Sequence, residues 1–164
     1  MVARPLVLVV VGVLLAACGS MRTVEQRTTQ GPSAEQLWTL RVMLANGREP
    51  TFEERRYWQD RMDLAIEDYL RRNQDFGNSL QVSTFRFLRQ TEVGMTKEQV
   101  LILLGPPLAV TTDAAQMEKI ARRYWPVIQG NATEAWIYPL GWNFYFSGPR
   151  LADITQHLDP DAKE

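Results

Sequence analysis

The chain of 164 residues is long enough for one domain with additional segments and too short for two full catalytic domains. Its composition, 45% hydrophobic and 23% charged, is typical of a globular protein and not of a disordered or repetitive one. The formal net charge of −1 provides no overall positive field that would attract nucleic acid. The single cysteine excludes an intramolecular disulfide and any metal site that requires a pair of cysteines.

The first residues have the pattern of an export signal. Residues 1–5 carry one arginine, residues 6–15 are wholly apolar, and Ala-Ala-Cys18 follows as a small-residue exit. The apolar run, at 1.5 Å per residue, spans roughly 18 Å, well below the ~30 Å hydrocarbon core of a bilayer. Residues 1–17 are therefore predicted to be a signal peptide and not a transmembrane helix.

The end of this segment, Leu15-Ala16-Ala17-Cys18, closely resembles the lipobox of bacterial lipoproteins. In those proteins a peptidase cleaves before a cysteine that carries a diacylglyceryl group. The resemblance implies that Cys18 becomes the acylated N-terminus, and several acyl chains make anchoring in a membrane stable. Because Gly19, and not aspartate, follows the cysteine, it also implies an outer-membrane location at the periplasmic face. The alternative is an ordinary signal peptide with an incidental cysteine.

Two polar segments are predicted to lie outside the folded body. Residues 18–32 lack hydrophobic periodicity and are rich in Thr, Gln, Ser and Gly, which indicates a lipidated cysteine followed by a flexible tether. Residues 157–164 are expected to form a frayed polar tail.

Two capping boxes predict a helical extension over residues 33–76. The first pairs Ser33 with Gln36, and the second pairs Thr51 with Glu54. The second helix is strongly amphipathic, and its apolar positions recur at helical spacing: Trp58, Met62, Ala65, Ile66, Tyr69 and Leu70.

The C-terminal half is predicted to combine short helices with a sheet. Residues 80–89 suit either helix or strand, and we favour helix. A helical insert is expected at about 112–128, with a helix over 114–124 that Trp125-Pro126 ends. Three short aromatic or β-branched runs, joined by tight turns, then predict a three-stranded antiparallel meander: residues 134–138, 142–146 and 150–155.

A short helix with sharply defined ends is predicted within residues 93–107. Thr96 and Gln99 make a capping box at its start, and Gly105 provides a left-handed stop before two prolines. An apolar stripe of Val100, Leu103 and Leu104 predicts that this motif helix packs on the meander.

This helix and the aromatic strands that follow it resemble the BamE family of small outer-membrane lipoproteins, also called SmpA/OmlA. The matching positions are Gly94, Met95, Thr96, Gln99, Val100, Leu104, Gly105, Pro107, Trp136, Tyr138 and Phe146. All of them are of types that serve as caps, core or turns, so they are expected to be structural.

The resemblance implies an α+β fold over residues 77–156, with two helices packed on a three-stranded antiparallel meander. It also implies a non-enzymatic accessory role in the machinery that folds and inserts β-barrel proteins, with barrel-assembly components as partners. The extension over 33–76 and the insert at about 112–128 depart from the compact family pattern.

Other function classes have weaker support. The one histidine, His157, is expected in the tail and not in a catalytic site, and Asp63 with Glu67 is better explained as a solvated helix face than as an acid pair. The chain has no P-loop, and neither a cofactor nor a nucleic-acid partner is expected. An alternative function is a binding or inhibitor module for a periplasmic hydrolase, like the domains of β-lactamase inhibitor proteins, with Trp142 and Tyr145 as exposed anchors.

Overall fold

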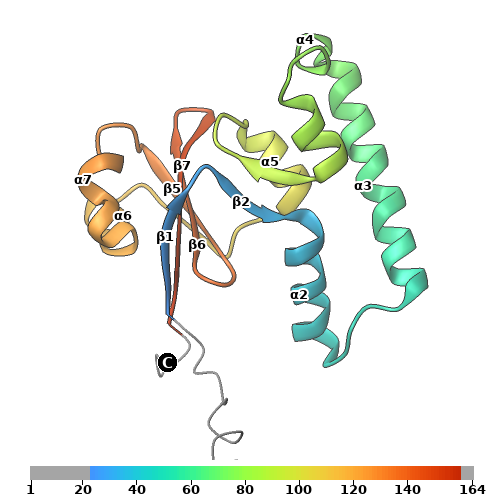
Figure 1. Cartoon of the computed structure of the whole chain (residues 1–164), viewed down its shortest axis with the longest axis horizontal. Helices are drawn as coiled ribbons and strands as arrows, with labels where there is room; N and C mark the ends of the chain where they lie inside the picture. The colour runs from blue at the N-terminus through green and yellow to red at the C-terminus, as the bar shows by residue number, and fades with distance from the viewer. Residues whose placement is uncertain (1–22, 160–164) are drawn as a thin grey trace, which may run out of the picture.

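The computed structural model of the chain describes residues 23–159 (Figure 1). The predicted signal peptide and Cys18 lie outside these residues. The described part combines helices with an antiparallel sheet, which confirms the predicted α+β class.

A five-stranded antiparallel sheet forms the centre of the described fold. Its spatial order is β1 (Val24–Thr28), β7 (Arg150–Leu158), β6 (Trp142–Ser147), β5 (Glu134–Tyr138) and β4 (Ala109–Thr111). The predicted meander is confirmed as its three central strands, in the register Trp136 opposite Phe144 and Phe144 opposite Ile154. A separate two-stranded ribbon consists of β2 (Gln30–Ser33) and β3 (Gln90–Glu92).

The helices begin and end largely where local capping requires. They are α2 (Ala34–Asn46), α3 (Phe52–Arg72), α4 (Gln74–Gly77), the π-helical turn η1 (Thr84–Leu88), α5 (Lys97–Leu104), α6 (Ala114–Ala121), the 3₁₀ turn η2 (Arg122–Tyr124) and α7 (Trp125–Ile128). Both hydrogen bonds of the capping box are present at the start of α2, α3 and α5. The helix favoured within residues 80–89 is confirmed over the π-helical turn.

The sheet is covered on both faces, so the described fold has three layers (Figure 1). Side chains alternate across a strand, and on β6 this directs Phe144 and Phe146 to one face and Tyr145 to the other. The first face packs against α2, α3 and α5. The second face packs against α6 and α7, whose Met117 and Ile128 contact Tyr145 in a smaller core. The predicted helical insert therefore covers the second face of the sheet.

The predicted helical extension shares the main core with the motif helix. Leu37 of α2 and Ile66 of α3 are almost completely buried in the same cluster as Val100 of α5. Burial of such side chains stabilises a fold by about 1.5–3 kcal/mol each. Helices α2 and α3 are therefore packed into the fold that contains the motif.

The prediction of a flexible tether is wrong for residues 24–32. Residues 24–28 form β1 and pair with β7 over five positions, and β2 begins at Gln30. The physical reason is the free edge of β7, which satisfies the backbone of a polar segment that has no hydrophobic periodicity. An ion pair between Arg27 and Asp153, 2.7 Å from Nη2 to Oδ2, reinforces this pairing.

The prediction of a frayed C-terminal tail over residues 157–164 is wrong for its first two residues. His157 and Leu158 belong to β7, where they pair with Glu25 and Val24. Because β1 extends the sheet at this end, β7 continues to Leu158 instead of fraying. The tail residues 160–164 lie outside the described residues.

The prediction that Trp125-Pro126 ends a helix is wrong as well. Helix α6 ends at Ala121, and a new helix, α7, begins at Trp125. Proline fits the first turn of a helix because its missing N–H would have no partner there. Pro126 therefore starts a helix at this position.

Candidate functional site

The predicted motif residues come together as one structural unit. Their apolar members, Met95, Val100, Leu104, Trp136, Tyr138 and Phe146, all lie in the main core with 6% exposure or less. Thr96 caps α5, Gly94 and Gly105 adopt positive φ angles, and Pro107 is half-buried after the helix. Gln99 completes the capping box of α5 with Thr96.

Specific contacts join the motif helix to the sheet. The Tyr138 hydroxyl donates to the Gly105 carbonyl oxygen at 2.9 Å, and burial raises the pKa of this hydroxyl, so it stays protonated as a donor. Lys97 forms an ion pair with Glu134 and lies over the ring of Phe146, 5.5 Å from its centroid. The polar groups of Tyr138, Lys97 and Glu134 thus all bind to other parts of the chain. They connect the motif helix to the sheet and are not available to bind a ligand.

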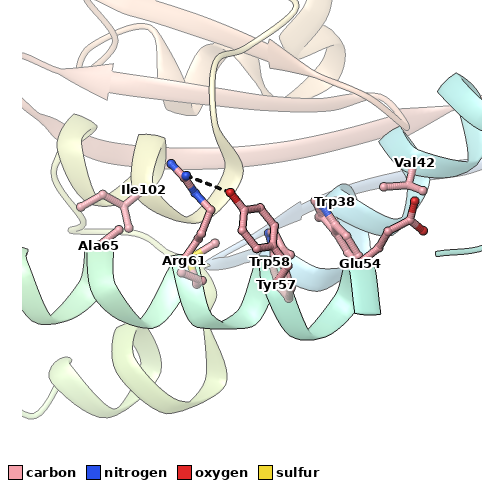
Figure 2. A pocket seen from close by; sticks show the side chains of 9 residues that line it. Trp38, Val42, Glu54, Tyr57, Trp58, Arg61, Ala65 and Ile102 are labelled. Carbon is pink, nitrogen blue, oxygen red and sulfur yellow. Dashed lines mark hydrogen bonds between the residues drawn. The ribbon is translucent and has the colours of Figure 1, made fainter. Parts of the chain in front are cut away.

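The surface feature best suited to binding is a groove between α2 and α3, which we call the α2/α3 groove. It has a volume of about 450 Å³ and is lined by Trp38, Val42, Glu54, Tyr57, Trp58, Arg61, Met62, Ala65 and Ile102. Figure 2 shows these side chains projecting from α2, α3 and α5. Predominantly apolar and aromatic lining with a few polar groups is typical of ligand and peptide sites.

Two stacked indoles form the aromatic part of the groove. The ring centroids of Trp38 and Trp58 are 4.8 Å apart and the ring planes differ by 14°. The guanidinium of Arg89 lies over Trp58, 6.0 Å from the ring centroid, and is itself held by an ion pair with Asp63 at 2.5 Å. Stacking on each other and the contact with Arg89 thus hold the two tryptophans in place at the groove.

The rim of the groove combines an exposed aromatic ring with a cation. Tyr57 is 64% exposed, and Arg61 donates to its hydroxyl at 3.3 Å. Arg61 forms no ion pair within the described residues 23–159. Leu44 and Phe52 on the same helices are also more than 70% exposed. Exposed apolar side chains on the helices that form a groove are typical of a protein contact surface.

Glu54 connects the groove to the start of α3. Its carboxylate accepts from Arg48 Nη1 at 2.8 Å and from the Thr51 backbone N–H at 2.8 Å. These hydrogen bonds, first that from Arg48 and then that from Thr51, lower the pKa of Glu54 from 4.5 to about 2. The carboxylate thus remains ionised at all but very acidic pH and keeps the capping box intact.

The hydrogen bonds of Glu54 predict how the stability of the protein depends on pH. Because the folded-state pKa is depressed, the stabilisation by Glu54 is fully present above about pH 4.5 and is lost as the pH falls towards 2. NMR titration of the Glu54 side-chain carboxyl should give a midpoint near pH 2. Arg48→Ala should move this midpoint upward, and Arg56→Ala, on the same helix without a hydrogen bond to Glu54, should not. An unchanged midpoint in Arg48→Ala would contradict the assignment.

Several residues considered in the sequence do not form a site. Tyr145 is fully buried and Trp142 packs against the main core, so the exposed anchors expected for the inhibitor module are wrong. Asp63 and Glu67 are paired with arginines from the segment around η1 and not with each other. His157 lies in β7, where the backbone N–H donates to the Gly141 carbonyl. None of these residues lines the α2/α3 groove.

The groove depends on residues that sequence patterns identify only as helix faces. Trp58 stands in the apolar stripe of α3, but its stacking on Trp38 requires α2 and α3 to fold against each other. Within residues 23–159, no group of three or more His, Cys, Asp or Glu residues is placed to hold a metal ion. No helix in that same range is both long and apolar enough to cross a membrane.

Comparison with known proteins adds no relative. No protein-family model matches the chain, and no curated protein or solved structure matches it either.

Proposed function

We propose that the protein is a lipid-anchored accessory protein of the outer membrane, which acts at the periplasmic face through protein contacts and not through catalysis. The lipobox-like segment ending at Cys18 supports anchoring. The motif helix packed on an antiparallel meander supports a BamE-like domain, extended here by α2 and α3. On this proposal the partners are barrel-assembly components, and the protein supports outer-membrane protein assembly or envelope integrity.

The α2/α3 groove is the observation that carries the proposed mode of action. Its stacked indoles and other apolar side chains line a groove between α2 and α3, and an amphipathic helix docks into an apolar groove of this kind. Arg61 at the rim has no carboxylate partner among residues 23–159. The proposed occupant is therefore a partner helix that presents an apolar anchor with an acidic residue beside it.

A charge reversal in the groove tests the proposed contact. Arg61→Glu should reduce recovery of barrel-assembly components, in affinity capture from detergent-solubilised membranes, by about tenfold, which corresponds to about 1.4 kcal/mol. Arg56→Glu is the matched control, because it makes the same change on an exposed position of α3 outside the groove. Equal recovery with both variants, or recovery of only unrelated proteins with the wild type, would contradict the proposal.

Anchoring is tested separately at Cys18. The wild-type chain should incorporate labelled fatty acid and fractionate with the outer membrane, because several acyl chains make membrane binding effectively stable. Cys18→Ser should abolish both properties, and Cys18 is the only cysteine, so no second thiol can replace it. Labelling and outer-membrane fractionation that persist in Cys18→Ser would show the anchor proposal to be wrong.

A further inference from the structure

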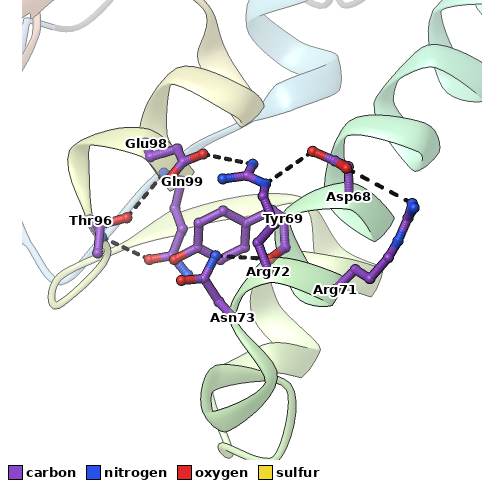
Figure 3. Close-up of polar contacts among 8 residues, drawn as sticks. All are labelled: Asp68, Tyr69, Arg71, Arg72, Asn73, Thr96, Glu98 and Gln99. Carbon is purple, nitrogen blue, oxygen red and sulfur yellow. Dashed lines mark hydrogen bonds and ion pairs between the residues drawn. The ribbon is translucent and has the colours of Figure 1, made fainter.

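A second cavity, distinct from the α2/α3 groove, lies where the end of α3 and α4 meet the start of α5. We call it the α4/α5 pocket. Its volume is about 770 Å³, and it is lined by Tyr69, Arg71, Arg72, Asn73, Gln74, Asp75, Phe76, Ser79, Gln81, Thr96, Gln99 and Arg150. Figure 3 shows part of this lining, with the side chains of Tyr69, Asn73 and Gln99 close together. The size lies within the ~300–1,000 Å³ range of small-ligand sites.

The most informative group in the α4/α5 pocket is the side-chain amide of Gln99. Its oxygen accepts from the Thr96 backbone N–H at 2.7 Å in the capping box, which settles which end of the amide faces the helix start. The NH₂ end is therefore left for the pocket. Gln99 is only 1% exposed, and its Nε2 has no hydrogen-bond partner within residues 23–159. A buried donor without a protein partner is rare, and any acceptor that reaches it, from a ligand or from water, offsets the cost of burying it unpaired.

A second buried donor in the pocket also lacks a hydrogen-bond partner among the described residues. The hydroxyl of Ser79, on the segment after α4, is buried and also has no partner in the part of the chain that the structure describes. Gln99 Nε2 can only donate, and a hydroxyl can donate as well. Both groups can therefore donate a hydrogen bond to an acceptor atom of a bound ligand.

Three arginines, Arg71, Arg72 and Arg150, line the pocket. Arg72 is largely occupied, because it pairs with Glu98 at 2.8 Å and with Asp68 at 3.1 Å. Arg150 donates from Nη1 to the Gly94 carbonyl oxygen, which leaves its other N–H groups available. Arg71 is 74% exposed, and its nearest carboxylate oxygen in the described chain is 3.9 Å away, on Asp68. Two guanidinium groups can thus still bind an anion.

The surroundings favour a singly charged oxyanion next to an apolar group. Asp75 lines the pocket, and Glu98 lies beside it, so a second negative charge on the ligand would be repelled. The rings of Tyr69 and Phe76, with centroids 5.9 Å apart, line the same cavity and offer apolar contact. A carboxylate attached to a peptide combines one negative charge, two acceptor oxygens and an apolar neighbour.

We propose that the α4/α5 pocket binds a carboxylate presented by a peptide, with Gln99 Nε2 and Ser79 Oγ as buried donors and with Arg71 and Arg150 as ionic partners. The carboxylate comes either from the end of a chain or from an acidic side chain. This binding site is separate from the α2/α3 groove, and it does not depend on lipid attachment or on the partner proposed for that groove.

The test uses the full-length protein in detergent micelles and NMR of side-chain N–H groups. Titration with N-acetyl-tetraalanine bearing a free C-terminus should shift the Gln99 amide and the Arg71 and Arg150 guanidinium signals. The C-terminally amidated peptide should bind at least tenfold more weakly. An amidated peptide with one internal glutamate distinguishes the two sources of the carboxylate, because it restores binding only if an acidic side chain is accepted.

Gln99→Glu is the sharpest variant. A glutamate at this position keeps the capping box, as Glu54 does at the start of α3, but replaces the donor NH₂ with a carboxylate oxygen that repels the ligand. Peptide binding should fall at least tenfold. Gln36→Glu makes the same change in the capping box of α2, away from the pocket, and should leave peptide binding unchanged.

Arg71→Gln provides a second variant at an exposed position. It should weaken peptide binding about tenfold, and binding by the wild type should also weaken as salt is raised. The proposal is overturned if the free and amidated tetraalanine peptides bind equally, or if no signal shifts at millimolar peptide. It is also overturned if inorganic phosphate binds more tightly than the peptides, or if Gln99→Glu and Arg71→Gln both bind like the wild type.

Discussion

Replacing Gly141 with alanine is expected to cause the largest loss of stability of any single substitution proposed for this protein. Gly141 lies in the turn between β5 and β6 at φ +71°, and a Cβ there would stand 1.6 Å from the backbone carbonyl oxygen of His157. The obstacle is the backbone of β7 and not the end of a flexible side chain. In addition, the Gly141 carbonyl accepts from the His157 N–H at 2.9 Å, so the two segments cannot separate without losing this hydrogen bond.

The expected loss for Gly141→Ala is about 4 kcal/mol or more, which is a large part of the ~5–15 kcal/mol stability of an ordinary domain. Chemical denaturation followed by circular dichroism measures it. Gly148→Ala is the matched control, because Gly148 also has a positive φ, +56°, but nothing lies within 4 Å of its added Cβ. It should cost only about 1–2 kcal/mol, the penalty of the left-handed conformation. Similar losses in both variants would contradict the close contact with β7.

Phe146→Ala is expected to have the second largest effect, a loss of about 3–5 kcal/mol in the free energy of unfolding. Phe146 is completely buried on β6, and its ring centroid is 4.5 Å from that of Trp136 on β5. Lys97, at the start of α5, lies over the same ring. Truncation leaves a cavity where the motif helix α5 packs on the sheet. It therefore weakens both the packing within the core and the contact between α5 and the sheet.

The control for Phe146→Ala is Phe87→Ala. Phe87 is 70% exposed on the π-helical turn, so the same truncation removes little buried surface. The expected change is about 0.5 kcal/mol or less. Denaturant titration of both variants under identical conditions compares them directly. A loss below about 1 kcal/mol for Phe146→Ala would show that the position is not part of a tightly packed core.

Features that depend on residues close in the chain were predictable. The Thr96–Gln99 capping box needs only two side chains three positions apart, and both of its hydrogen bonds form as expected. Side-chain alternation along β5 likewise accounts for Trp136 and Tyr138, two positions apart, lying on one face of the sheet in the main core. Local hydrogen bonding and side-chain periodicity decide such features before any long-range contact forms.

Features that depend on distant partners were not predictable in this way. Residues 24–28 have the composition of a tether, and they become a strand because β7 offers an unpaired edge about 130 positions later. The short β4 likewise forms against β5 and carries little pattern of its own. The stacking of Trp38 on Trp58 and the isolation of the Gln99 amide also require elements that meet only in the folded chain.

Neighbouring residues or composition define the capped helices, the meander with its motif helix and the lone Cys18, so these features can be predicted from the sequence. Long-range contacts in the folded chain create the five-stranded sheet, the α2/α3 groove and the α4/α5 pocket. A free strand edge, an aromatic stack and an unpartnered buried amide are properties of surfaces that meet in space, and separation along the chain does not encode them.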